Sequence, residues 1–141
     1  MVAVNGLIIK AKEKPLITEI PGHSGLKAWE IIRPGENGSV HLRMLLNEFE
    51  PGGGIELHYH DLVPVADHAY YVISGKIKAV IGDKEEIVGP DTLLYCLTDT
   101  LHSIENVGKK PAKLLRIGAA ATGDSSGKSV FVKQKKRRSK A

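Results

Sequence analysis

The chain of 141 residues is 42% hydrophobic and carries a formal net charge of +4, which fits one globular domain with enough apolar content for its own core. It contains no run of about eighteen apolar residues, so no membrane span is expected. The N-terminal sequence MVAVNGLIIKAKEKP lacks the basic-then-apolar pattern of a signal peptide. The single cysteine, Cys96, excludes an internal disulfide and fits a reducing compartment. We therefore expect a cytoplasmic protein.

The positive charge is concentrated at one end of the chain. Residues 133–141 (KQKKRRSKA) hold six of the 20 Lys and Arg residues and no acid, so the rest of the chain has 14 basic against 16 acidic side chains. The globular part is therefore mildly acidic, and the tail is expected to be a solvated, disordered end. A basic tail can also bind nucleic acid or an anionic surface, although no aromatic residue interleaves this one to stack on bases.

The first half of the chain is expected to consist of short strands. Residues 6–12 fit a strand, and a turn follows at 21–25. Residues 26–33 fit a strand or a helical turn, and a strand is favoured because the turn-forming sequence PGENG (34–38) follows. The next expected elements are a long strand over 40–50, a turn at 51–54, and strands over 55–60, 68–74 and 76–81.

The second half continues the same pattern. Gly-Asp at 82–83 is expected to turn a hairpin into a strand over 85–88. A loop of small and polar residues starts at Gly118. Further strands are expected over 92–97, 102–107, 113–117 and 130–132. Many short strands separated by turns, with little helix, predict an antiparallel sandwich or barrel built by residues 1–132 as one domain.

Histidines in the middle of the chain carry the strongest functional signal. His58 and His60 are separated by one tyrosine in an expected strand, so both imidazoles point to the same side. His68 comes just before the next apolar run, and His102 opens a later strand. Imidazole is a common metal ligand, and strand faces that carry such groups converge inside a barrel. The pattern therefore favours a metal site.

The first group of histidines lies in a segment that resembles the first motif of the cupin family, G-x5-H-x-H-x(3,4)-E-x6-G. Gly52, His58, His60 and Gly75 match this motif. His68 stands where the family usually has glutamate, six residues before Gly75, and the gap that precedes it is longer than usual.

A second segment resembles the other cupin motif, G-x5-P-x-G-x2-H-x3-N. His102 and Asn106 match it, whereas Asp91 and Asp99 replace the two glycines and Leu97 replaces the proline. Aspartate tolerates the left-handed backbone better than most residues, so the two turns remain possible.

The resemblance, which runs from about residue 40 to residue 117, implies an all-β fold, an antiparallel jelly-roll barrel whose mouth holds one divalent metal ion. The ligands it implies are His58, His60, His68 and His102, with Asp67 as the rival of His68. Four neutral imidazoles would leave the full charge of the ion in place, and they suit Fe, Mn, Ni, Zn or Cu. The resemblance also implies a homodimer.

Three further residues are candidates for chemistry. Glu56 and Tyr70 are expected to share the faces of the histidines, where either could move a proton, although a solvated charge is the simpler interpretation of Glu56. Arg43 could clamp a substrate carboxylate if it faces inward, and the opposite register is equally open.

These observations predict a metal-dependent enzyme that acts on a small oxygen-rich metabolite such as a keto acid, sugar acid or enediol. A metal with open coordination positions supports dioxygenase, isomerase or lyase chemistry. The alternatives are a non-catalytic ligand-binding or sensor protein, and a nucleic-acid-associated protein that uses the basic tail.

Overall fold

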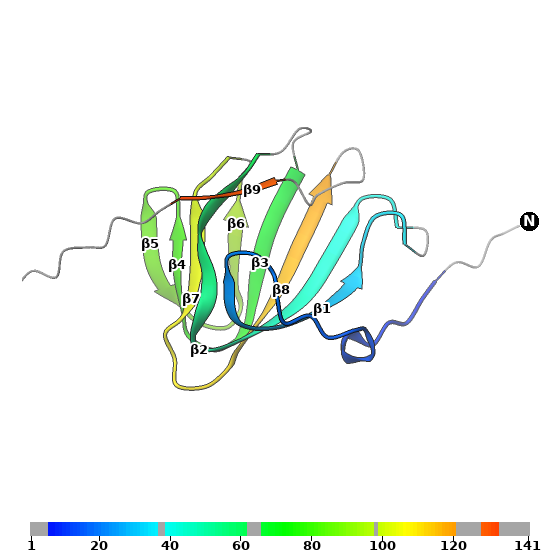
Figure 1. The fold of residues 1–141 in the computed structure, drawn as a ribbon, viewed down its shortest axis with the longest axis horizontal. Coiled ribbons are helices and arrows are strands. Elements are labelled where there is room, and N and C mark those ends of the chain that lie inside the picture. The colour runs from blue at the N-terminus through cyan, green and yellow to red at the C-terminus, as the bar shows by residue number, and fades with distance from the viewer. Residues whose placement is uncertain (1–5, 37–38, 62–65, 98, 121–127, 133–141) are drawn as a thin grey trace, which may run out of the picture.

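The expected all-β architecture is confirmed by the computed structural model, which describes residues 6–36, 39–61, 66–97, 99–120 and 128–132. One nine-stranded antiparallel sheet curls into a nearly closed barrel (Figure 1). Its strands are β1 (His23–Ile32), β2 (Leu42–Asp61), β3 (Ala66–Ser74), β4 (Ile77–Ile81), β5 (Lys84–Val88), β6 (Thr92–Cys96), β7 (His102–Asn106), β8 (Ala112–Ala120) and β9 (Lys128–Phe131). No helix among the described residues is long and apolar enough to cross a membrane. The basic segment 133–141 lies outside the described residues.

The strand β2 organises the sheet, whose order is β5-β4-β7-β2-β8-β3-β6 with β1 and β9 also paired to β2. One edge of β2 pairs first with β8 and then with β7, and the other edge pairs first with β1 and then with β9. The C-terminal end of β2, which carries His58 and His60, therefore lies between β7 and β9.

The turn predicted at residues 51–54 is wrong, because β2 continues through it as one strand of 20 residues. Gly52 has a φ of 82°, which bends the strand, and the register with β1 shifts between Ser24 and Leu26. A side chain at Gly54 would place Cβ 2.0 Å from the carbonyl oxygen of Ile104 on β7. The glycines therefore let β2 turn a corner and approach β7 closely without leaving the sheet.

The strand expected at residues 6–12 is also wrong. This segment has no strand, and Ala11–Glu13 form a short 3-10 helix, η1. The apolar residues Leu7 and Ile8 remain exposed because no neighbouring strand pairs with them. Lys12 instead lies 5.0 Å from the ring centre of Trp29 and forms an ion pair with Glu48 at 2.8 Å.

The barrel interior is filled by side chains from both halves of the chain. The apolar cluster consists of Leu26, Ala28, Phe49, Ile55, Tyr70, Val72, Ile77, Ala79, Leu94, Ile104, Ala112 and Leu114. These residues come from β1 to β4 and from β6 to β8, and neighbours such as Tyr70 and Val72 are two positions apart, as the pleat requires. This apolar filling occupies one part of the interior, and the histidines lie beside it.

Two features of the second family motif have clear structural roles. Asp91 and Asp99 have φ angles of 62° and 65°, so both adopt the left-handed backbone that the motif needs. The buried Asn106 donates to the carbonyl oxygens of Phe49 (2.9 Å) and Lys110 (2.8 Å), and its Oδ1 accepts from the amide of Gly108 (2.9 Å). Asn106 thus joins β7 to β2 and to the loop before β8.

Candidate metal centre

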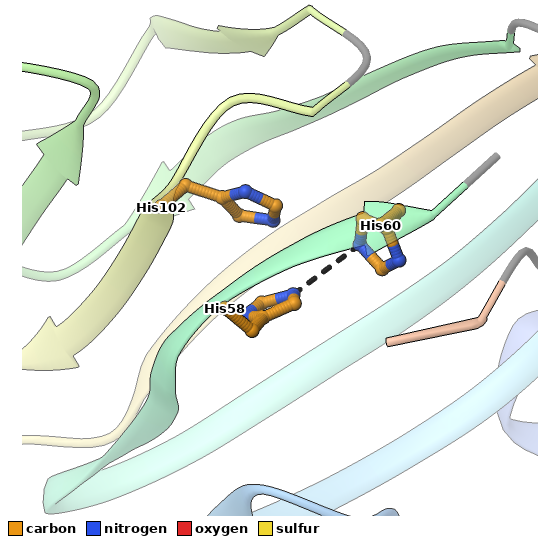
Figure 2. Close-up of side chains that lie close together, drawn as sticks. All are labelled: His58, His60 and His102. Carbon is orange, nitrogen blue, oxygen red and sulfur yellow. Dashed lines mark hydrogen bonds between the residues drawn. The ribbon is translucent and has the colours of Figure 1, made fainter. Parts of the chain in front are cut away.

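Three histidines from two adjacent strands meet inside the barrel. His58 and His60 project from β2, and His102 lies opposite His58 on β7 (Figure 2). The Nε2 atoms of His58 and His60 are 3.2 Å apart, and the ring centres of His58 and His102 are 4.1 Å apart. One nitrogen from each of the three residues lies within 4.8 Å of the others, and all three side chains are buried.

Backbone carbonyls fix which nitrogen of His58 and His102 carries the proton. The Nδ1 of His58 lies 2.7 Å from the carbonyl oxygen of Glu56, and the Nδ1 of His102 lies 2.9 Å from that of Thr100. A carbonyl oxygen only accepts, so each Nδ1 must donate, and a neutral imidazole then has a bare Nε2. Both residues belong to the three-histidine cluster, and a bare nitrogen is what metal ligation requires.

The pKa values of the histidines support neutral rings. Burial is the main cause, and it lowers the pKa of His60 to about 3 and that of His102 to about 4, with neighbouring histidines and Arg116 adding to the effect. Burial followed by the charge of Arg116 lowers the pKa of His68, and burial also lowers that of His58. A neutral ring carries a lone pair on one of its nitrogens, which metal ligation requires.

The residues present fit a metal ion. The Nε2 atom of His102 is buried and has no hydrogen-bond partner among the described residues, a costly state that a bound cation would relieve. With His58 and His60 it completes a three-nitrogen set, and imidazole nitrogens suit Zn, Cu, Fe and Ni. Three buried histidines could therefore hold a metal ion.

His68 lies near this cluster without being part of the compact set. Its ring centre is 4.6 Å from that of His60 and 5.4 Å from that of His102. Its Nε2 accepts a long hydrogen bond of 3.4 Å from Nε of Arg116, so the lone pair is engaged. The rival ligand Asp67 is exposed and accepts from the hydroxyl of Tyr95 at 2.6 Å.

The C-terminal strand β9 covers one side of the cluster. Phe131 lies opposite His58 in the register, with ring centres 5.4 Å apart. Ser129 lies opposite His60, with its Oγ 3.4 Å from Nδ1. An edge strand was expected here, but nothing in the sequence placed it beside the histidines.

The expected position of Glu56 is wrong. It was expected to share a face with His58 and His60, but a bulge between Ile55 and His58 leaves the Glu56 side chain exposed. Only its backbone carbonyl reaches the site, where it accepts from His58.

Tyr70 and Arg43 both face the interior. The buried Tyr70 has its ring centre 5.0 Å from that of His68, and burial raises the pKa of its hydroxyl to about 12. Arg43 lies in register with Gly118, which lies opposite His68, so it points to the same side of the sheet. Its guanidinium pairs with Glu30 through Nε (3.0 Å) and Nη2 (2.9 Å).

Sequence reasoning missed Arg116. It is on β8 opposite Tyr70, half-buried, and donates a hydrogen bond to His68. The signal that could have found it is alternation, because Leu114 and Gly118, two residues to either side, are both buried. A charged residue in register with buried neighbours points into the interior.

A protein-family model described as "Cupin domain" matches residues 45–118, more than half of the chain. The chain belongs to the cupin family. The matched region contains His58, His60, His68 and His102, so the family resemblance seen in the sequence is confirmed.

One curated relative shares part of this domain. Mannose-1-phosphate guanylyltransferase 2 from Escherichia coli O157:H7 is 31% identical over 90 residues, which cover 62% of this chain and 17% of the relative. This chain thus spans about a sixth of that protein.

Solved structures support the jelly-roll barrel. The polyketide cyclase RemF from Streptomyces resistomycificus has a TM-score of 0.72 and 16% identity, with 93% of this chain and 88% of that chain covered. A predicted oxalate decarboxylase from Thermotoga maritima has a TM-score of 0.69 and 17% identity, with coverages of 80% and 98%. Oxalate decarboxylase from Bacillus subtilis, as the S161A mutant, has a TM-score of 0.66 and 23% identity, with coverages of 86% and 31%. At these identities, the likeness shows the fold.

Proposed function

We propose that this cupin is a metal-dependent enzyme that acts on a small oxygen-rich metabolite. The proposed ligands are His58, His60 and His102, joined by His68 once its Nε2 is released from Arg116. One observation carries the proposal: carbonyl oxygens hold His58 and His102 with bare Nε2 atoms, and that of His102 has no partner in the described part of the chain.

When bound, a divalent ion would supply a Lewis acid able to polarise a substrate oxygen or lower the pKa of bound water. The surrounding residues orient the substrate and exclude water. Tyr70 remains protonated because its pKa is raised to about 12, so its hydroxyl can donate to a developing oxyanion. Arg116 supplies positive charge next to it.

The described interior is poor in free carboxylates. Glu30 faces inward but is paired with Arg43, and the side chain of Glu56 is exposed. A catalytic role for Arg43 is therefore proposed as indirect, through the position of Glu30, and Glu56 acts through its carbonyl on His58. This favours reactions driven by the metal and by charge stabilisation over reactions that need a carboxylate base.

The partners proposed are a small-molecule substrate and a second copy of the chain. Ile73, Leu93 and Tyr95 are exposed on β3 and β6, and we refer to these three residues as the outer apolar face. A sheet face of this kind is suited to pairing with another copy. The cytoplasmic location stays a prediction from the single cysteine, which is buried and free.

The experiment has two steps. Elemental analysis of the purified protein should find about one metal ion per chain. Oxygen consumption and product formation are then screened across keto acids, sugar acids and catechols with the metal-loaded protein and its His102→Ala variant. Turnover by the wild type alone supports an enzyme, whereas tight ligand binding without turnover favours the sensor alternative.

A further inference from the structure

The interior beside the histidines contains a cation without an acidic partner. Arg116 forms no ion pair with Asp or Glu in the described part of the chain, although its side chain is half-buried. The inward-facing carboxylate of Glu30 lies in the same cross-strand row, but it is held by Arg43 at 2.9 Å. Burial of a guanidinium is favourable only with a counter-charge, so this position is suited to an anion.

A second unsatisfied group lies on β2, the strand that pairs with the strand of Arg116. Asn47 is fully buried on β2, and neither its amide nitrogen nor its amide oxygen has a hydrogen-bond partner among the described residues. Asn47 lies opposite Leu114 of β8 in the register, and Leu114 is two residues from Arg116 on that strand. The side chains of Asn47 and Arg116 both face the interior. Unpaired buried amides are rare in folded proteins and call for a ligand or water.

A third observation concerns the contact that Arg116 makes in its present position. Its Nε donates to Nε2 of His68 across 3.4 Å, at the long end of hydrogen-bond distances. This bond uses the lone pair that His68 would offer to a metal. The neighbouring hydroxyl of Tyr70 is a second donor at the same place.

We propose that the barrel interior binds a small organic acid whose carboxylate pairs with Arg116 and Asn47, and that Arg116 leaves His68 when the acid enters. The acid is a 2-oxo or 2-hydroxy carboxylate, because its second oxygen can face the histidine cluster while its carboxylate faces the guanidinium. The exchange frees Nε2 of His68 as a fourth metal ligand. Acid and metal therefore bind with positive coupling, and each tightens the other by the same factor. This second half rests on the proposed metal site.

The first experiment uses metal-free protein and pyruvate as the probe, measured by titration calorimetry. The wild type should bind pyruvate and should not bind methyl pyruvate, which has no charge. Arg116→Gln should weaken binding by about tenfold or more, because a charge-assisted pair is lost. The pyruvate affinity of Arg116→Lys should lie between those of the wild type and Arg116→Gln, because lysine keeps the positive charge but lacks the two-donor geometry of the guanidinium. Arg33→Gln is the matched control, because Arg33 is an exposed arginine.

A second variant separates a binding role from a structural one. Asn47→Leu removes an unpaired buried amide, so its melting temperature should be unchanged or higher while its affinity for pyruvate falls. Equal pyruvate affinity in the wild type and in folded Arg116→Gln would overturn the proposed pairing of the carboxylate with Arg116. The absence of pyruvate binding by the wild type would overturn it as well.

The coupling is tested with Co²⁺ by competition against a chelator dye, with and without pyruvate. Pyruvate should tighten Co²⁺ binding several-fold in the wild type and leave it unchanged in Arg116→Gln. Co²⁺ binding that ignores pyruvate would overturn the exchange while the proposed metal site stands. Pyruvate binding without any Co²⁺ binding would refute the metal site and support the pairing of the carboxylate with Arg116. The two failures are therefore distinguishable.

Discussion

His58 and His102 face each other across β2 and β7, and each donates its Nδ1 proton to the carbonyl oxygen two residues earlier in the chain. The two acceptors are the backbone carbonyl oxygens of Glu56 and Thr100. The tautomers of the two histidines are therefore set by the fold and not by neighbouring side chains. The cluster is thus organised before a ligand arrives, and the ordering entropy is already lost on folding.

The first prediction concerns metal content. Replacing His58 or His102 with Ala should reduce bound metal from about one ion per chain to a small fraction, because a three-nitrogen set loses one member. His41→Ala is the control, since His41 is exposed and lies outside the cluster. The measurement is elemental analysis after gel filtration, and full occupancy in His102→Ala would contradict the ligand assignment.

The second prediction concerns stability against pH in metal-free protein. Burial lowers the pKa of His60 to about 3 and that of His102 to about 4, from 6.5. At pH values between 6.5 and these lowered pKa values, the unfolded chain binds protons that the folded chain does not. The free energy of unfolding should therefore fall as the pH falls below 6.5. Each neutral histidine contributes a slope of up to about 1.4 kcal/mol per pH unit.

Denaturant titrations at pH 7, 6 and 5, with a chelator present, measure this slope. The variant His60→Gln serves as the comparison and should show a shallower decline than the wild type. Identical slopes would mean that His60 becomes protonated in the folded protein over the same range.

The third prediction concerns the corner of β2. Gly54→Ala should destabilise the protein by about 3 kcal/mol or more, because the new Cβ would meet the backbone oxygen of Ile104 at 2.0 Å. Gly89→Ala is the matched control, with no atom within 4 Å of the added Cβ, and should be neutral or slightly stabilising. Thermal melting compares the two, and equal melting temperatures would contradict the close approach of β2 and β7.

The fourth prediction concerns Asn106. Its replacement by Ala removes three hydrogen bonds, one of them to the carbonyl of Phe49 in the interior. The expected loss is about 2–4 kcal/mol of the free energy of unfolding. Glu105→Ala, the exposed neighbour, should change stability little. A loss of metal binding without a loss of stability would instead assign Asn106 a role at the site.

The fifth prediction concerns assembly. If the outer apolar face joins two copies, Leu93→Glu should convert a dimer into a monomer, because it buries a charge at the contact. Ile87→Glu is the control, since Ile87 is equally exposed at 55% but lies on β5. Light scattering after gel filtration gives the mass, and a dimer that survives Leu93→Glu would place the contact elsewhere.

Most strands could be predicted from the sequence, because segments of strand-forming residues alternate regularly with turn residues from residue 23 onward. The hairpin at 82–83 and the left-handed Asp91 and Asp99 were readable from local chemistry. The corner at 51–54 was not, since whether glycines end a strand or bend it depends on the strands that pair on either side. The N-terminal segment failed for the same reason, because Leu7 and Ile8 needed a partner that the fold does not supply.

The site was predictable where a motif covered it. Sequence spacing located His58, His60 and His102, whose rings do converge. The bulge that turns Glu56 outward lies between two motif positions, and period-two counting cannot detect it. Arg116 lies on a strand without a motif. Alternation could place its side chain in the interior, but its contact with His68 spans 48 positions in the chain, so only the pairing of β3 with β8 reveals that contact.

The position of β9 affects when the histidines of β2 become covered during synthesis of the chain. The histidines of β2 leave the ribosome about seventy residues before the Phe131 ring and Ser129 hydroxyl that lie against them. Until then the nascent chain exposes this edge of β2 to the surrounding solution. Capture of an ion by the growing chain would thus take place in a more open setting than capture by the released protein.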